Sequence, residues 1–130
     1  MPAAFDAQAS VLGFGVTTLT TPAFTISGAD RAGMLQHVRN GNTISGISGS
    51  IGGASASAIT GADTGTGNGA GRSLCWGVTA PATGSQTGTL TWTTAADSEL
   101  GAITATGVDQ TTPFNNGANA VDTAGNSKAI

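Results

Sequence analysis

Apolar side chains along this chain alternate with small or polar ones at a spacing of two, in short stretches. In the segment GTLTWTT, Leu90 and Trp92 share one face, and the threonines around them share the other. This alternation is typical of a strand that is buried on one face only. Similar stretches predict six or more short strands, at residues 23–27, 33–38, 43–48, 72–79, 88–94 and 100–107.

Turn-forming residues separate these stretches, which favours antiparallel connections. The dipeptide Asn40-Gly41 suits a two-residue hairpin turn, so we expect residues 33–38 and 43–48 to pair as a hairpin. In the run RSLCWGVT, Leu74, Trp76 and Val78 are in phase and Cys75 lies opposite, which predicts a central strand covered on both faces.

The fold class that follows is all-β: an antiparallel β-sandwich, jelly-roll-like, with little or no helix, because Gly, Thr or Ser interrupts every apolar stretch before a helical stripe can form. We expect a single domain over residues 1–130, with extended arms at about residues 1–15 and about residues 114–130. Residues 44–62 fit either a close-packed strand pair or a loop ordered by a neighbour. The predicted structural core consists of Phe24, Ile26, Leu74, Trp76, Val78, Leu90, Trp92 and Ile103.

Composition suggests that this core is thin. The chain has 21 Gly, only two Trp and four Phe, and no Tyr, so apolar burial per residue should be low and association with a partner should add stability. The net charge of −3 with no Lys or Arg cluster argues against nucleic-acid and anionic-membrane partners. The N-terminus lacks a signal-peptide pattern and no apolar run approaches a membrane span, so we expect synthesis in a cytosol.

Candidate chemistry is sparse. His37, the only histidine, falls on the same side of its predicted strand as Leu35, which favours a structural role over catalysis. Cys75 has no partner for an intramolecular disulfide and is expected to be a buried thiol. We therefore predict no enzyme activity, no catalytic residues and no cofactor.

The Gly-rich run at residues 65–73 imitates a phosphate-binding loop but lacks its Lys and its spacing. Asp63, Thr64 and Asn68 could offer oxygens to calcium, yet the acidic spacing of a calcium loop is missing, so no metal site is predicted.

Three stretches resemble a recurrent β-sandwich module of phage virion proteins: ADRAGMLQHV, LCWGVTAPATGSQTGTLTW and LGAITATGVDQTTPF. In that family a Ser/Asp-Asn-Arg turn opens an apolar strand, and an "APATG" turn ends a second strand. The next strand carries alternating Thr and Trp or Val, and a "GVDQTTP" turn closes a further strand. Asp30 and Arg31, residues 80–84 and residues 107–113 occupy those places here. The resemblance covers residues 24–113, although residues 34–38 are less apolar than the family's corresponding strand.

The resemblance implies a sandwich that decorates capsids or builds tail and fibre appendages. We therefore expect a capsid decoration (cement) protein, made in the host cytoplasm and carried on the capsid surface of the virion. Its expected partners are the major capsid protein and further copies of itself, as a homotrimer because three-fold shell sites match closed cyclic symmetry. The alternative is a tail-fibre or carbohydrate-binding module for a host surface, with Trp76 and Trp92 as its candidate stacking residues.

Overall fold

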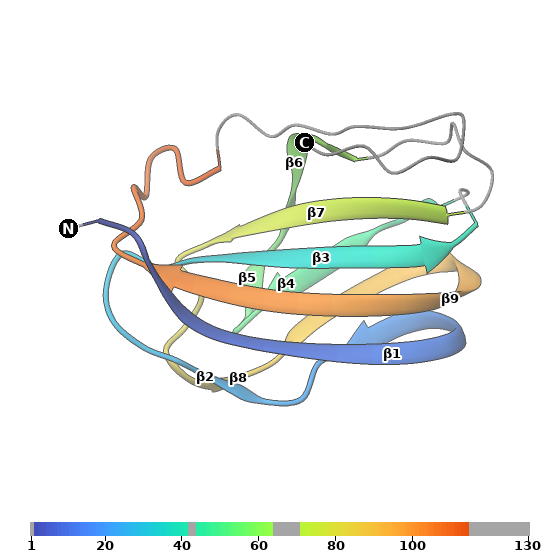
Figure 1. Cartoon of the computed structure of the whole chain (residues 1–130), viewed down its shortest axis with the longest axis horizontal. Coiled ribbons are helices and arrows are strands. Elements are labelled where there is room, and N and C mark those ends of the chain that lie inside the picture. Colours follow the sequence, from blue (N-terminus) through green and yellow to red (C-terminus); the bar gives the residue numbers. More distant parts are fainter. Residues whose placement is uncertain (1, 42–43, 64–70, 115–130) are drawn as a thin grey trace.

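The computed structural model describes residues 2–41, 44–63 and 71–114, and these residues contain strands and connections but no helix (Figure 1). The prediction of an all-β, antiparallel, sandwich-like fold is confirmed. The strands in chain order are β1 (Ala4–Thr20), β2 (Phe24–Ile26), β3 (Ala32–Asn40), β4 (Ser48–Ile51), β5 (Ala54–Ser55), β6 (Ser57–Asp63), β7 (Gly71–Thr79), β8 (Gly84–Gln86) and β9 (Gly88–Thr106).

The long strand β9 joins the two layers of the sandwich. One edge of β9 pairs with β1, while the other edge pairs with β4 over its first half and with β3 over its second half. The front layer in Figure 1 is therefore β1–β9–β3–β7, and β4 and β5 lie behind it. The order β5-β4-β9-β3-β7-β6 curls almost into a barrel, and β2 and β8 form a separate two-stranded sheet.

Alternation along the strands divides inner from outer side chains. On β9, Leu90 and Trp92 are buried while Thr91 and Thr93 are exposed, as the sequence predicts. The inner faces of the two layers supply one hydrophobic cluster: Leu19, Phe24, Ile26, Leu35, Ile51, Val78, Leu90, Trp92, Leu100 and Ala102. Burial of this apolar surface is the main force that holds the layers together.

The small β2–β8 sheet contributes to this core from the side. Phe24 and Ile26 are buried, and Thr25 between them is exposed. Three paired residues would not hold a sheet together alone, so the burial of these two side chains positions the pair.

Most predicted core residues are buried, with two exceptions. Phe24, Ile26, Leu74, Val78, Leu90 and Trp92 are buried. Trp76 is partly buried and packs against the core. Ile103 was predicted to be core but is 38% exposed, because Leu100, Ala102 and Thr104 occupy the inner phase of that part of β9. The predicted strands at residues 88–94 and 100–107 are also one continuous strand.

The predicted hairpin at Asn40-Gly41 is wrong. Gly41 has the expected positive φ of 82°, but β3 pairs with β7 and β9 along its two edges. Both neighbouring positions are therefore occupied, and the chain crosses to the other layer. There the Ser45 carbonyl accepts a hydrogen bond from the Thr93 backbone N–H at 3.1 Å.

The expected N-terminal arm is instead a strand. β1 begins at Ala4 and pairs with β9 along its length, with register shifts near Phe5 and between Gly13 and Thr18. The residues expected to form a free arm thus complete the front layer. The expected C-terminal arm lies, apart from Phe114, outside the described residues, as do positions 64–70 of the glycine-rich run and of the calcium candidate.

Residues 44–62, which the sequence left open between strands and loop, contain β4, β5 and all of β6 except Asp63. Ile51 is fully buried, whereas Ile47 is partly buried against the core. Small residues permit the close approach here: a Cβ added to Gly49 would lie 2.6 Å from Leu90 and 2.9 Å from the Thr89 carbonyl oxygen.

Candidate interaction surface

The outer face of the front layer presents three rows of side chains, each crossing β1, β9 and β3. The strand register aligns them as Leu12–Glu99–Val38, Ser10–Gly101–Gln36 and Gln8–Ile103–Met34. The middle row is low because Gly101 has no side chain, and a Cβ added there would meet nothing within 4 Å. The two bulkier rows therefore border a depression over β9.

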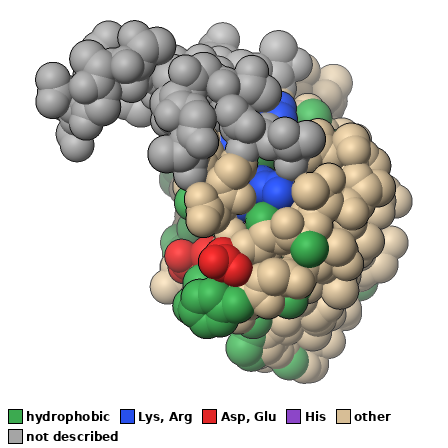
Figure 2. All heavy atoms as spheres, turned by 90° about the vertical axis from the view of Figure 1, so that its right-hand side faces the viewer, with side chains coloured by type: hydrophobic (Ala, Val, Ile, Leu, Met, Phe, Trp, Pro, Cys, Tyr) green, Lys and Arg blue, Asp and Glu red, His purple; other side chains and the backbone are tan. Residues whose placement is uncertain are grey.

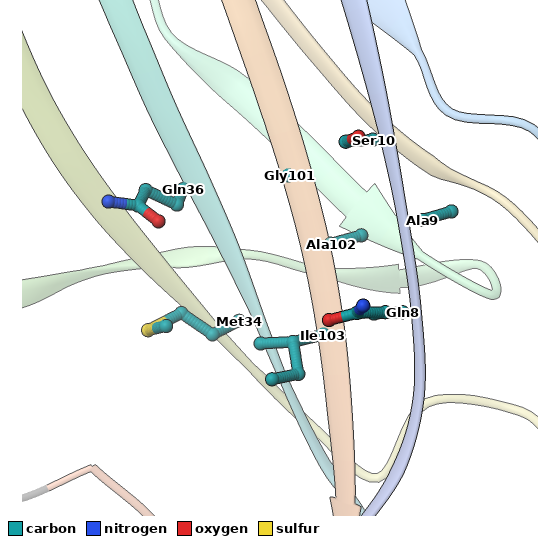
Figure 3. A pocket seen from close by; sticks show the side chains of 8 residues that line it. All are labelled: Gln8, Ala9, Ser10, Met34, Gln36, Gly101, Ala102 and Ile103. Carbon is teal, nitrogen blue, oxygen red and sulfur yellow. The ribbon is translucent and has the colours of Figure 1, made fainter.

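This depression is a groove of about 350 Å³ (Figure 3). Gly101 and Ala102 lie at its centre on β9, Gln8 and Ser10 come from β1, and Gln36 comes from β3. The amide groups of the two glutamines can donate and accept hydrogen bonds. The groove thus offers neutral polar groups around a flat floor and contains no charged side chain.

Large apolar side chains gather on the same face. Among the described residues, the exposed large hydrophobic side chains are Phe5, Leu12, Phe14, Val38 and Ile103. Leu12, Val38 and Ile103 belong to the rows above, and Phe5 shares with Ile103 and Phe114 an apolar hollow of about 300 Å³ at the end of the face. The apolar side chains therefore lie towards the two ends of this face, on either side of the polar middle row. Exposed large apolar side chains on one face often mark an interaction site.

Charge is confined to one end of this face. Asp97 and Glu99 line a shallow hollow of about 200 Å³ together with Leu12 and Val38. Figure 2, which views this end of the molecule, shows acidic side chains beside a hydrophobic patch. Across the three rows Glu99 is the only charged residue, so the face suits a partner surface with little charge of its own.

The turns at residues 28–31, 80–84 and 107–113 meet at the opposite end of the sandwich. The Ala80 N–H donates to the Arg31 carbonyl at 2.9 Å, and the Val108 N–H donates to the Asp30 carbonyl at 2.8 Å. Arg31 also donates through Nε to the Pro81 carbonyl at 2.7 Å. Asp30 and Ala80 both have φ near +50°, a conformation that costs energy for a residue with a side chain. These segments form one hydrogen-bonded cluster with a structural role.

A second polar cluster lies inside the sandwich. His37 is fully buried on the same side of β3 as Leu35, as predicted, and its ring lies 4.3 Å from that of Trp92. Arg39, two residues further along β3, is 4% exposed and donates through Nη2 to the Thr94 carbonyl at 3.2 Å. Both His37 nitrogens, Nε and Nη1 of Arg39, and Nε1 of Trp92 have no hydrogen-bond partner.

Burial controls the protonation of this cluster. Desolvation, and then the positive charge of Arg39, lower the pKa of His37 to about 4, so its imidazole is neutral at pH 7. Burial and the neighbouring Arg72 also lower the pKa of Arg39. Because no surface of His37 is open, a substrate cannot reach it as a general base.

The remaining candidates for chemistry give no centre in the part of the chain that is described. Cys75 is partly rather than fully buried, on the outer side of β7, and burial raises its thiol pKa. No group of three or more His, Cys, Asp or Glu side chains occurs within residues 2–41, 44–63 and 71–114. No helix that could span a membrane is found there either.

Comparisons with protein-family models, curated proteins and solved structures found no match. The site must therefore be interpreted from its own residues. Sequence reasoning missed the outer face because it assigned β1 to an arm and Ile103 to the core. The alternation of Gln8, Ser10 and Leu12 with Ala9 and Val11 was the signal that could have revealed β1.

Proposed function

We propose that this chain is a structural virion protein of the capsid decoration (cement) type, and that the outer face of β1–β9–β3 attaches it to the major capsid protein. The observation that carries the proposal is that Leu12, Val38 and Ile103 are exposed on a single sheet face, whose carboxylates, Asp97 and Glu99, are confined to one end. Such a face gains free energy when a partner covers it. The resemblance of the clustered turns at residues 80–84 and 107–113 to the phage virion module supplies the partner class.

The function is mechanical and needs no reaction. A decoration protein stabilises a shell by burying surface across neighbouring subunits, so that expansion or opening must expose that surface again. The groove between Gln36 and Ser10 fits an extended, uncharged segment of the shell, whose backbone could bond to the glutamine amides. The carbohydrate alternative has less support, since Trp92 is buried and Trp76 packs against the core.

Attachment to purified shells tests the proposal. Gln36→Lys places an unpaired charge in the groove at an exposed position, and we expect it to weaken binding at least tenfold, or about 1.4 kcal/mol. Ser85→Lys, an exposed change on β8, is the matched control and should bind normally. Equal binding of both variants, measured by co-sedimentation with shells, would exclude this face, and absence of binding by the unmodified protein would exclude the function.

A further inference from the structure

The edge of β1 is an open sheet edge. Within the described residues β1 pairs with β9 alone, and its residues 7–13 do so without a register shift. Among the bonds described, no hydrogen bond from an element other than β9 reaches the backbone of residues 8–13. In Figure 1, β1 is the outermost strand of the front layer.

Burial along β1 shows that the core is open at this edge. Ala102 and Leu100 on β9 are 2% and 0% exposed, yet their cross-strand partners Ala9 and Val11 on β1 are only partly buried. Inward side chains of a covered strand would be buried like those of β9. A further strand beside β1 would complete the burial of Ala9 and Val11.

The usual protection against edge pairing is missing from this stretch. Natural sheets protect an edge with charged side chains, Pro, bulges or short strands. The sequence AQASVLG at residues 7–13 has neither charge nor Pro, and the register shifts of β1 lie outside it. Asp6, the nearest charged residue in the sequence, accepts hydrogen bonds from Ser27 at 2.6 Å and 3.0 Å.

We propose that the β1 edge pairs antiparallel with the β1 edge of a second copy of this chain, about a two-fold axis at Ser10. This register places Ala9 opposite Val11 and Gln8 opposite Leu12, so inward residues face inward residues and outward residues face outward ones. The stretch is therefore complementary to itself. The two front layers become one continuous sheet across the dimer.

Symmetry favours a second copy over an unrelated strand. In a two-fold dimer the β1 edges of both copies are paired with each other, so the assembly is closed. If β1 paired with a different edge of the next copy, an open chain of copies would always end in one unpaired β1 edge. The uncharged stretch adds no repulsion between identical copies. This proposed dimer differs from the expected homotrimer, and it does not depend on the proposed attachment to a shell.

Disulfide trapping of the isolated protein tests the pairing. In a Cys75→Ser background, Ser10→Cys should form a covalent dimer under mild oxidation, because the two-fold axis brings these positions side by side. Gln36→Cys in the same background is the matched control. It is exposed on the same face but lies on β3, between two paired neighbours, and should stay uncrosslinked.

Sedimentation of the unmodified protein provides the second measurement. We expect dimers, and we expect Ser10→Lys to weaken dimerisation at least about tenfold while the far-ultraviolet dichroism stays unchanged, since two ammonium groups would meet at the axis. A monomer at the highest soluble concentration, a trimer, or equal crosslinking at Ser10 and Gln36 positions would overturn the proposal. Failure of the unmodified protein to bind shells would leave this dimer unaffected and would count only against the proposed function.

Discussion

The two tryptophans, Trp92 on β9 and Trp76 on β7, differ in how deeply they are buried. Trp92 is 2% exposed and belongs to the hydrophobic core, whereas Trp76 is only partly buried. We predict that Trp92→Ala lowers the free energy of unfolding by about 3–5 kcal/mol, as expected for emptying a buried aromatic site. Trp76→Ala should cost less. Urea denaturation measures both, and a larger loss for Trp76→Ala would contradict the assignment of the two rings.

His37 predicts a pH dependence of stability. Its pKa is about 4 in the folded protein and about 6.5 when unfolded, so the unfolded state binds more protons between these values. The contribution of His37 to the free energy of unfolding should therefore be complete above pH 6.5. It should decrease by on the order of 3 kcal/mol as the pH falls towards 4. His37→Gln should remove this part of the decline, and an unchanged pH profile of the unfolding free energy would contradict the burial of a neutral imidazole.

The sequence alone predicted correctly which face of its strand many side chains occupy. The alternation of Leu90 and Trp92 identified the inner face of β9, and the phase of Leu35 located His37. The prediction for Ile103 was wrong, because the smaller Ala102 and Thr104 occupy the inner phase of β9 there. The unpartnered donors of Arg39 could not be foreseen, since they depend on which chain segments meet inside the sandwich.

Two glycines on neighbouring strands, Gly49 on β4 and Gly101 on β9, differ in how much space surrounds them. A Cβ on Gly49 of β4 would lie 2.9 Å from the Thr89 carbonyl oxygen, which is fixed by the sheet. We predict that Gly49→Ala costs about 1–3 kcal/mol because β4 must move away from β9. Gly101→Ala is the matched control: its added methyl meets nothing, so stability should change by less than about 0.5 kcal/mol. Equal effects in thermal unfolding would refute the close approach of β4.

The role of β1 leads to a prediction about truncation. A free arm could be removed without loss of the fold, but deletion of residues 1–15 takes away most of β1 and exposes Leu100 and Ala102. We therefore expect the truncated protein to be unfolded or strongly destabilised. A truncated protein with native dichroism and a cooperative unfolding transition would restore the arm interpretation.

Strand pairing shows where sequence reasoning stops. Strand positions follow from local alternation, and five of the six predicted stretches coincide with strand residues over most of their length. Strand partners do not follow from local alternation. Gly41 has the positive φ that a hairpin turn needs, but long-range pairing assigns both edges of β3 to β7 and β9. β1 was missed because register shifts and glycines break its pattern into short pieces.

The whole molecule combines a thin core with two surfaces that a partner could cover. The outer face of β1–β9–β3 offers apolar area to the proposed capsid partner, and the β1 edge offers backbone groups to the proposed second copy. Both surfaces carry little charge, so association should depend only weakly on salt. The hydrogen-bonded turns at residues 28–31, 80–84 and 107–113 and the buried His37 cluster stabilise the fold that positions these surfaces.

Heat-induced genome release from purified phage shells is the most direct test of the central claim. Shells carrying the unmodified protein should release their genome at a higher temperature than bare shells. Shells incubated with Gln36→Lys should behave like bare shells, and those with Ser85→Lys like the unmodified protein. If all four preparations release at the same temperature, the protein does not stabilise a shell and the account of its function is wrong.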